Sequence, residues 1–298
     1  MRRLSQVFVF SLVLVFVGDL SGFAADPFVP FNLYHGHIIV VKCSIGSLRD
    51  LTAIVDTGAS ETVVDMEMVR KLSLALQPDS ATFITHTAKV WAVAIPGMQL
   101  GSIRVDRLEG IATDLSSLTA KLGIRPQVLI GMDVLRRSSF LIDYRSHRLI
   151  FGVLPRLAHS VPLLSSGDSN LRFAVIESTI EGHRLRLQVD TGFESVLLYQ
   201  GRVPGLDRDG LSGAAFGGFA SHNHNEDARI VNVTQGLTAR SFASVDIQIG
   251  EWHVPHAQIS VVDGPSPESA EFDGLIGSAF LSRQRVAFDF ENGIVSWE

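Results

Sequence analysis

The residues of this chain most able to do chemistry are two copies of one triplet. They are Asp56-Thr57-Gly58 and Asp190-Thr191-Gly192. Each copy follows a short apolar run, so a strand is expected to hold each carboxylate rigidly. Glycine lets the backbone turn tightly and bring an N–H group to the carboxylate, while the threonine hydroxyl can lock the loop with a hydrogen bond.

Two such loops placed side by side would offer a pair of carboxyl groups. Like charges a few ångströms apart do not both ionise easily, so the pair would share one proton. The ionised carboxylate then serves as general base toward a water molecule, and the protonated one as general acid toward a carbonyl oxygen. One loop supplies only half of this chemistry, so the prediction depends on both copies.

The repetition extends beyond the triplets. Residues 128–135 (VLIGMDVL) are echoed by 274–281 (GLIGSAFL), and residues 140–144 (FLIDY) by 286–290 (VAFDF). Three motifs in the same order in both halves predict two homologous lobes. The predicted lobes are residues 30–154 and 160–298, joined near Leu154 and Pro155.

The elements that position the triplets are expected to be β-strands. Apolar and β-branched runs broken by turn residues predict two hairpins in each lobe, one leading into the triplet and one closing the lobe. The hairpins are expected over 38–55 and 142–151, and over 173–189 and 287–297. Helical pattern is sparse, with candidates at 66–76 and 132–137. Many short strands with regular turns predict a small barrel in each lobe.

The first 25 residues have the pattern of a secretory signal peptide. Arg2 and Arg3 precede an apolar stretch over 7–17, and small residues follow as far as Ala25. The stretch is shorter than the roughly 20 residues of a membrane-spanning helix, so we expect cleavage after Ala24 or Ala25 rather than retention as an anchor. The mature protein is then expected to be exported to the periplasm or the medium, without stable membrane insertion.

Composition narrows the class of partner. A chain of 298 residues, 46% of them hydrophobic, is long enough for two domains with real cores. Its net charge of −6 leaves no basic face for a phosphate backbone, so nucleic-acid binding is not expected. The single cysteine, Cys43, cannot form an internal disulfide and is expected to be a buried strand residue.

The histidines give only a weak indication of a metal site. His222 and His224 lie in a Gly/Ser/Asn/His stretch over 205–227, and His253 and His256 follow later. His-x-His spacing without an accompanying carboxylate pattern favours a solvated surface loop over a metal site. We therefore expect neither a metal nor another cofactor.

At its triplets the chain resembles the retropepsin-like aspartic peptidases, specifically exported, bacterial-type forms with two Asp-Thr-Gly lobes in one chain. The family pattern is an apolar strand, Asp-Thr-Gly-Ala-Ser and, further on, two apolar residues and Gly. The first lobe matches this pattern over 55–60 and at 130–131, and the second at 190–192 and 276–277.

The resemblance implies an all-β fold of two acid-protease barrels related by a pseudo-two-fold axis, with the active-site cleft between them. It makes Asp56 and Asp190 the catalytic pair, with crossed threonine hydrogen bonds beneath it. The residues that support the two loops are then Thr57, Gly58, Thr191 and Gly192. One chain would suffice for an aspartic endopeptidase that acts as a monomer on a peptide or protein substrate.

Some residues depart from related patterns. Pepsin-like enzymes usually carry a flap tyrosine and disulfides, whereas the first flap here has Trp91 and the chain has one cysteine. The resemblance places the flap tips near 85–89 and 234–240. Phe193-Glu194 departs from the family pattern, and the bulky ring is expected to narrow the cleft. The alternative function is a catalytically silent peptide-binding or envelope interaction protein on the same fold.

Overall fold

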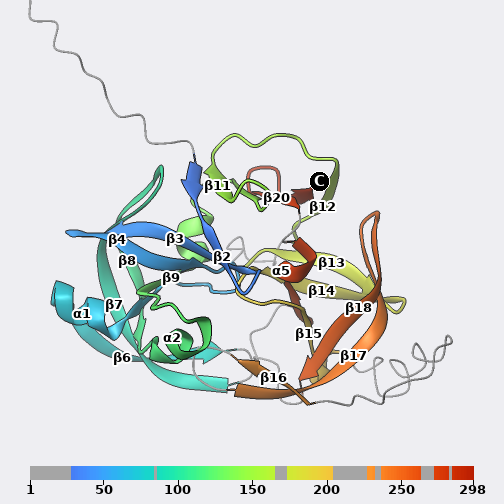
Figure 1. Ribbon diagram of the computed structural model, residues 1–298, viewed down its shortest axis with the longest axis horizontal. Helices are drawn as coiled ribbons and strands as arrows, with labels where there is room; N and C mark the ends of the chain where they lie inside the picture. The colour runs from blue at the N-terminus through green and yellow to red at the C-terminus, as the bar shows by residue number, and fades with distance from the viewer. Residues whose placement is uncertain are drawn as a thin grey trace, which may run out of the picture.

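The computed structural model describes residues 28–83, 86–164, 173–203, 227–231, 236–262, 272–281 and 284–298. Within them the chain is built mainly of β-strands (Figure 1). The predicted signal peptide lies outside the described residues, as does nearly all of the predicted loop over 205–227, with His222 and His224.

The first barrel contains the first triplet. Its sheet has the order β2-β3-β4-β9-β5-β8-β7-β6, and β3 also pairs with β7, so six of its strands form a closed ring. The strands are β2 (Asn32–Tyr34), β3 (Ile38–Ile45), β4 (Leu48–Val55), β5 (Val63–Asp65), β6 (Leu76–Phe83), β7 (His86–Leu100), β8 (Ile103–Thr113) and β9 (Val128–Ile130).

The second barrel repeats this connectivity. Its order is β13-β14-β19-β15-β18-β17-β16, and the additional β13–β17 pairing again closes a ring of six strands. The strands are β13 (Val175–Ile180), β14 (His183–Asp190), β15 (Val196–Tyr199), β16 (Asp227–Val231), β17 (Gly236–Ile249), β18 (Trp252–Val262) and β19 (Gly274–Gly277). The two closed rings confirm the all-β fold and a small barrel around each triplet, whereas the pseudo-two-fold axis stays a prediction.

A third sheet of six strands, called the joint sheet below, connects the two barrels. Its order is β1-β11-β10-β20-β21-β12. At its centre β10 pairs with β20, where the buried rings of Phe140 and Phe288 stack with centroids 4.7 Å apart. The strands are β1 (Phe28–Pro30), β10 (Phe140–Asp143), β11 (Arg148–Phe151), β12 (His159–Pro162), β20 (Arg285–Asp289) and β21 (Ile294–Trp297).

Short helices fill the connections. They are α1 (Met66–Leu72), α2 (Ser116–Leu122), α3 (Met132–Leu135), the 3-10 turn η1 (Gln200–Arg202) and α5 (Ser278–Leu281). The helix predicted over 66–76 ends earlier, because Ser73 adopts a left-handed conformation (φ 51°) and its N–H bonds back to the carbonyl of Arg70. Helix α2 was not predicted, although Leu118 and Leu122 have helical spacing and pack on β3 and β4.

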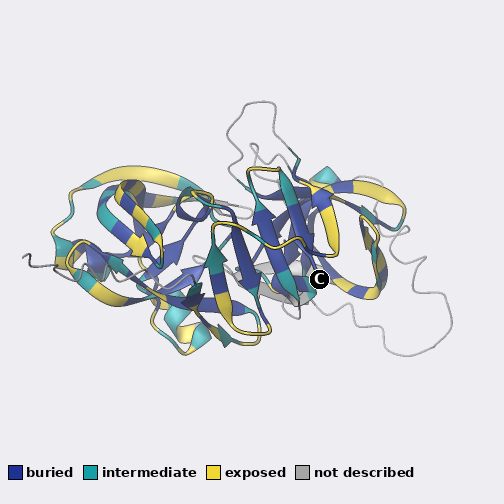
Figure 2. Cartoon of the chain, turned by 90° about the horizontal axis from the view of Figure 1, so that it is seen from above, coloured by how far each residue is buried: buried dark blue, intermediate teal, exposed yellow. Residues whose placement is uncertain are grey.

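The core is continuous from one barrel to the other. One cluster of buried side chains includes Ile45 of the first barrel, Ile142 of the joint sheet and Ile247 of the second barrel. Figure 2 shows buried residues along the strands of both barrels and exposed residues mainly at the outer loops. Cys43 belongs to this core, where burial raises the pKa of its thiol to about 12. The barrels therefore form a firmly packed support for the loops between them.

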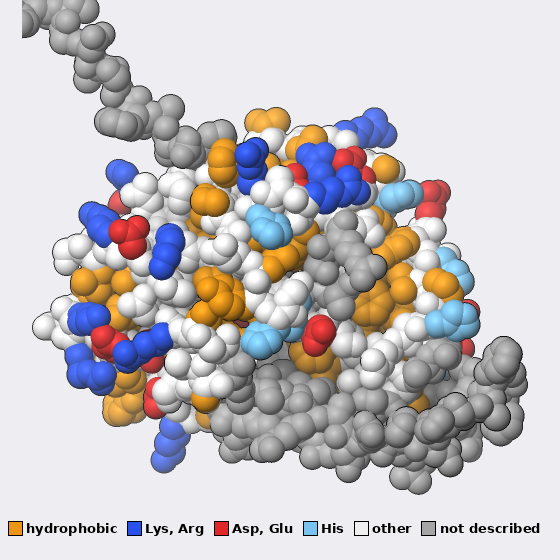
Figure 3. Space-filling model, in the orientation of Figure 1, with side chains coloured by type: hydrophobic (Ala, Val, Ile, Leu, Met, Phe, Trp, Pro, Cys, Tyr) orange, Lys and Arg blue, Asp and Glu red, His pale blue; other side chains and the backbone are white. Residues whose placement is uncertain are grey.

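The surface is mixed in charge. On the face drawn in Figure 3, the basic side chains of the described residues lie among acidic ones and form no continuous patch. In the described part of the chain, no helix is long and apolar enough to span a bilayer.

Candidate active site

Both triplets lie at the ends of central barrel strands. The first follows β4, which pairs in parallel with β9, and the second begins on the last residue of β14, which pairs in parallel with β19. Each loop is then anchored in the same way. The N–H of Met132 bonds to the carbonyl of Ala59, and the N–H of Ser278 to that of Phe193, both at 2.8 Å. The apolar-apolar-Gly motifs at the end of β9 and within β19 thus hold the loops in place.

Two buried threonines connect the loops to each other. The N–H of Thr57 donates to Oγ1 of Thr191, and the N–H of Thr191 donates to Oγ1 of Thr57, both at 3.0 Å. Each hydroxyl then donates across the interface, from Thr57 to the carbonyl of Val189 (2.7 Å) and from Thr191 to that of Val55 (2.9 Å). The structure therefore contains the crossed bonds expected from the sequence, and they lock the two loops side by side.

This arrangement brings the two carboxyl groups together. Asp56 and Asp190 share a hydrogen bond. Each also accepts the N–H of the glycine two residues later, Gly58 or Gly192, at 2.8 Å. A Cβ on Gly192 would lie 2.7 Å from Oδ1 of Asp56, and one on Gly58 would collide with the Asp190 carboxyl. Glycine is required because each loop lies directly against the carboxyl of the other.

The two carboxyl groups are electrostatically unequal. Asp190 is only 9% exposed, whereas Asp56 is partly exposed. Burial raises the pKa of Asp56, and burial together with the charge of Asp56 raises the pKa of Asp190 well above its ordinary value. The shared proton is therefore best held by Asp190, which leaves Asp56 ionised.

A threonine and an aspartate that the sequence analysis did not single out support the first loop. Thr62 donates its hydroxyl to Oδ1 of Asp133 (2.7 Å) and its N–H to Oδ2 (2.9 Å), and it accepts the N–H of Gly131 (3.2 Å). Burial raises the pKa of Asp133. The sequence could have indicated this role of Asp133, because the residue lies two positions after the motif glycine, Gly131. The second lobe has Val196 and Ala279 at the corresponding positions.

A glutamine was also missed. Gln188 precedes the second triplet and is 2% exposed. Its Nε2 donates to the carbonyl of Gly58 at 3.1 Å and to that of Thr57 at 3.4 Å. Gln188 is separated from Gly58 by 130 positions in the sequence and from Thr57 by 131. A search for local motifs therefore does not detect these contacts.

The flap hairpins are present, but their predicted tips need correction. Strand pairing runs to Phe83 with His86 in the first hairpin and to Val231 with Gly236 in the second. Predicted tip residues such as Lys89 therefore lie in a paired strand, and the residues between the paired ends lie outside the described residues. The predicted tips were displaced toward the C-terminus because the second strand of each hairpin begins earlier than its apolar pattern.

Phe193 does not stand free beside the carboxyl pair. Its ring packs, partly buried, against a cluster in the second barrel that includes Leu197, Tyr199 and Phe272. The ring therefore contacts the barrel itself, and the narrowing of the cleft by this ring stays a prediction. Tyr199 lies near the pair, and burial followed by the charge of Asp190 raises the pKa of its phenol.

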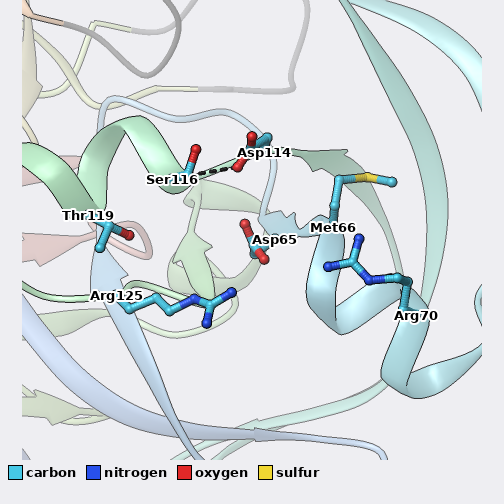
Figure 4. A pocket seen from close by; sticks show the side chains of 7 residues that line it. All are labelled: Asp65, Met66, Arg70, Asp114, Ser116, Thr119 and Arg125. Atoms are coloured by element: carbon cyan, nitrogen blue, oxygen red, sulfur yellow. Dashed lines mark hydrogen bonds between the residues drawn. The ribbon is translucent and has the colours of Figure 1, made fainter.

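A separate hollow of about 330 Å³ lies in the first lobe (Figure 4). Its lining residues are Asp65, Met66, Arg70, Asp114, Ser116, Thr119 and Arg125. Both carboxylate oxygens of Asp65 already accept backbone N–H groups, from Glu67 and from Leu115, each at 2.9 Å. Asp65 thus ties the start of α1 to the segment before α2, and the hollow shares no residue with the triplets.

The aspartates of the repeated 140–144 and 286–290 motifs have structural contacts. Asp143 accepts the N–H groups of Arg145 and Ser146, and Asp289 accepts that of Asn292, all at 3.0 Å, as expected for residues at hairpin turns. Among the described residues, no group of His, Cys, Asp and Glu side chains has an arrangement that would hold a metal ion.

Part of the chain matches a known protein family. Residues 41–134 match a family model described as aspartyl protease. The matched segment runs from β3 into α3 and contains the first triplet and the Ile130-Gly131 motif. No curated protein matches the chain.

Proposed function

We propose that the chain is a retropepsin-like aspartic endopeptidase that activates water with Asp56 and Asp190, a proposal supported by the match of residues 41–134 to the aspartyl protease family model. The observation that carries this proposal is the pair of hydrogen-bonded carboxyl groups on loops locked by Thr57 and Thr191. A fold that only needed to bind peptides would have no use for two acids in contact, one of them buried, since burying a charge is costly.

The unequal pair supplies both halves of the chemistry. The ionised Asp56 takes a proton from a water molecule while the water oxygen attacks the carbonyl carbon of a peptide bond. At the same time Asp190 gives its proton to the carbonyl oxygen. The product is a tetrahedral diol, with the proton now on Asp56. That proton then passes to the nitrogen, the C–N bond breaks, and a diol hydroxyl returns a proton to Asp190. A carboxylic acid and an amine leave, and the pair regains its starting state.

The support for a single-chain enzyme is that both loops come from one polypeptide and contact each other directly. A peptide or protein substrate would lie extended between the two barrels, beneath the β6–β7 and β16–β17 hairpins. The enzyme would act as a monomer, after export and removal of the first 25 residues.

The test is incubation of the purified protein with a mixed peptide library, followed by mass spectrometry of the products. We expect internal cleavage that a pepstatin-type inhibitor blocks and that the Asp190→Asn variant lacks. Asp143→Asn is the matched control, because its carboxylate caps a turn in the joint sheet, and it should retain cleavage. Peptide binding without any product from the parent protein would overturn the proposal and favour the catalytically silent alternative.

A further inference from the structure

Gln188 reaches from the second barrel into the catalytic loop of the first. It lies on β14 two residues before Asp190, so the alternation of a β-strand places both side chains on the same face of the sheet. The side chain is 2% exposed. Its Nε2 donates to the carbonyls of Gly58 (3.1 Å) and Thr57 (3.4 Å). A buried side-chain amide therefore lies next to the carboxyl pair, on one side of it.

The second of these contacts leads directly to Asp56. The Thr57 carbonyl and the Gly58 N–H belong to one peptide group, and that N–H donates to Oδ1 of Asp56 at 2.8 Å. A donor on the carbonyl polarises the peptide and makes its N–H a stronger donor, because hydrogen bonds in a chain reinforce one another. Hydrogen bonds to an ionised carboxylate favour the ionised form. Gln188 thus acts on Asp56 through one peptide bond.

The other lobe has no counterpart to this amide. The corresponding residue, two positions before Asp56, is Ile54. It is 3% exposed and packs with Ile38 and Val40 in an apolar cluster. Its side chain has no hydrogen-bonding group to offer to the loop that carries Asp190. The two loops share a triplet and differ in this support.

We propose that Gln188 is a positioning residue that makes the two carboxyl groups unequal, so that Asp56 is held as the ionised, water-activating member. The inference rests on the proposed function for its consequence in catalysis, but the inequality itself is a property of the free protein. It assigns the general base to the first lobe and the general acid to the second.

The electrostatics of the pair agree with this assignment. The titratable groups facing the pair, within the described part of the chain, are the two carboxyls themselves and the Tyr199 phenol on β15. Tyr199 lies on the side of Asp190 and is neutral in the acidic range, since burial raises its pKa. None of these facing groups is a cation that would stabilise the ionised form of one carboxyl over the other. The neutral amide of Gln188, which supports the Asp56 loop, therefore provides this difference.

The decisive measurement is a titration that needs no substrate. The carboxyl carbons of ¹³C-labelled aspartates are followed by NMR against pH in the parent, in Gln188→Met and in Ser178→Ala. Methionine keeps the size of the side chain but removes the donor. Ser178, on neighbouring β13, is equally buried at 2% exposed and its hydroxyl makes no hydrogen bond to either loop, so it controls for loss of a buried polar group.

We expect Gln188→Met to raise the lower apparent pKa of the pair by about half a unit to one unit, as for loss of support to a charged acceptor. Ser178→Ala should leave it unchanged. The acidic limb of the pH–rate profile should move by the same amount, with kcat reduced about threefold to tenfold and KM changed less than twofold. An unchanged titration in a folded Gln188→Met protein would overturn the proposal, whether or not the parent cleaves peptides.

A second measurement on the parent covers the case in which Gln188→Met does not fold. The side-chain amide resonances of Gln188 should exchange slowly with solvent and should shift with pH at the lower apparent pKa of the pair. Amide resonances that exchange freely, or that do not respond to ionisation of the pair, would overturn the proposal. Absence of cleavage by a parent protein that shows the expected titration would instead contradict the proposed function alone.

Discussion

The two Asp-Thr-Gly loops carry the same triplet in different surroundings. The first is supported by Thr62 and Asp133 and receives the amide of Gln188. The second lies beside Phe193, whose ring joins an apolar cluster and whose carbonyl accepts both the N–H and the hydroxyl of Ser278. A symmetric dimer of identical chains must present the same residue on both sides of its axis. Two lobes in one chain are free of that constraint, and here they differ in the residues that would fix which acid holds the proton.

The largest expected effect comes from removing either carboxyl group. Asp56→Asn and Asp190→Asn should each lower kcat by at least about 10³-fold, and the double variant should be hardly worse, because residues acting as one unit are strongly non-additive. Substantial cleavage by Asp190→Asn, together with none by Asp56→Asn, would contradict the view that the two carboxyl groups act as one unit. The second lobe would then be a scaffold.

Thermal unfolding of the same variants separates chemistry from folding. The pKa of Asp190 is raised in the folded state, so this residue lowers the stability of the fold as pH rises from its ordinary pKa through the raised one. Asn removes that penalty. At neutral pH the melting temperature of Asp190→Asn should therefore equal or exceed that of the parent.

The pH dependence of cleavage should be a bell on the acidic side of neutrality. Activity needs the singly protonated pair, so it should fall at low pH as Asp56 becomes protonated and at higher pH as Asp190 ionises. The raised pKa of Asp190 places the upper limb above the ordinary range of an aspartate. A rate that rises steadily into alkaline pH would point to a different nucleophile.

An intermediate effect, on stability, is expected from replacing Thr62 and Asp133 of the first loop by valine and alanine, the residues at the corresponding positions of the second. Thr62→Val leaves the partly buried Asp133 without its hydroxyl donor and should cost about 1–3 kcal/mol of unfolding free energy. Adding Asp133→Ala copies the second lobe fully and removes the stranded acceptor. The double variant should therefore be more stable than Thr62→Val, as measured by urea unfolding. Additive losses would show that the pair does not act as a unit.

The smallest effect is expected at Phe193, whose counterpart in the first lobe is Ala59. Phe193→Ala removes a partly buried ring from the cluster with Leu197 and Tyr199 and should cost roughly 1–2 kcal/mol. Because the ring packs on the barrel, kcat and KM on a short peptide should change less than about threefold. A large change in KM with unchanged stability would show instead that the ring contacts substrate.

Much of the site could be predicted because its chemistry is local in sequence. Two triplets, each paired with an apolar-apolar-Gly motif, were enough to expect the carboxyl pair, and the family resemblance added the crossed threonine hydrogen bonds; both are present. The barrels followed from the strand patterns. The contact of Gln188 with Gly58 could not be found this way, because it depends on how the two barrels meet.

The helices differ from the sequence prediction for local reasons. Helix α1 ends at Leu72 because Ser73 turns left-handed, although apolar residues continue to Leu76. Helix α2 was overlooked because its seven residues lie between strands and begin without a side-chain cap. In both cases backbone conformation, rather than hydrophobic pattern, determined the boundary.

The joint sheet has a consequence for the order in which the protein is made. Strands β10 and β12 are synthesised early, but their partners β20 and β21 come from residues 285–297. A nascent chain that has reached residue 281 already contains both triplets, yet it lacks the strands that fasten one barrel to the other. Such a polypeptide carries both Asp56 and Asp190 but lacks the β10–β20 and β12–β21 pairings that join the two barrels. If the protein is the peptidase proposed above, its activity should appear only once the last hairpin, β20–β21, has been made.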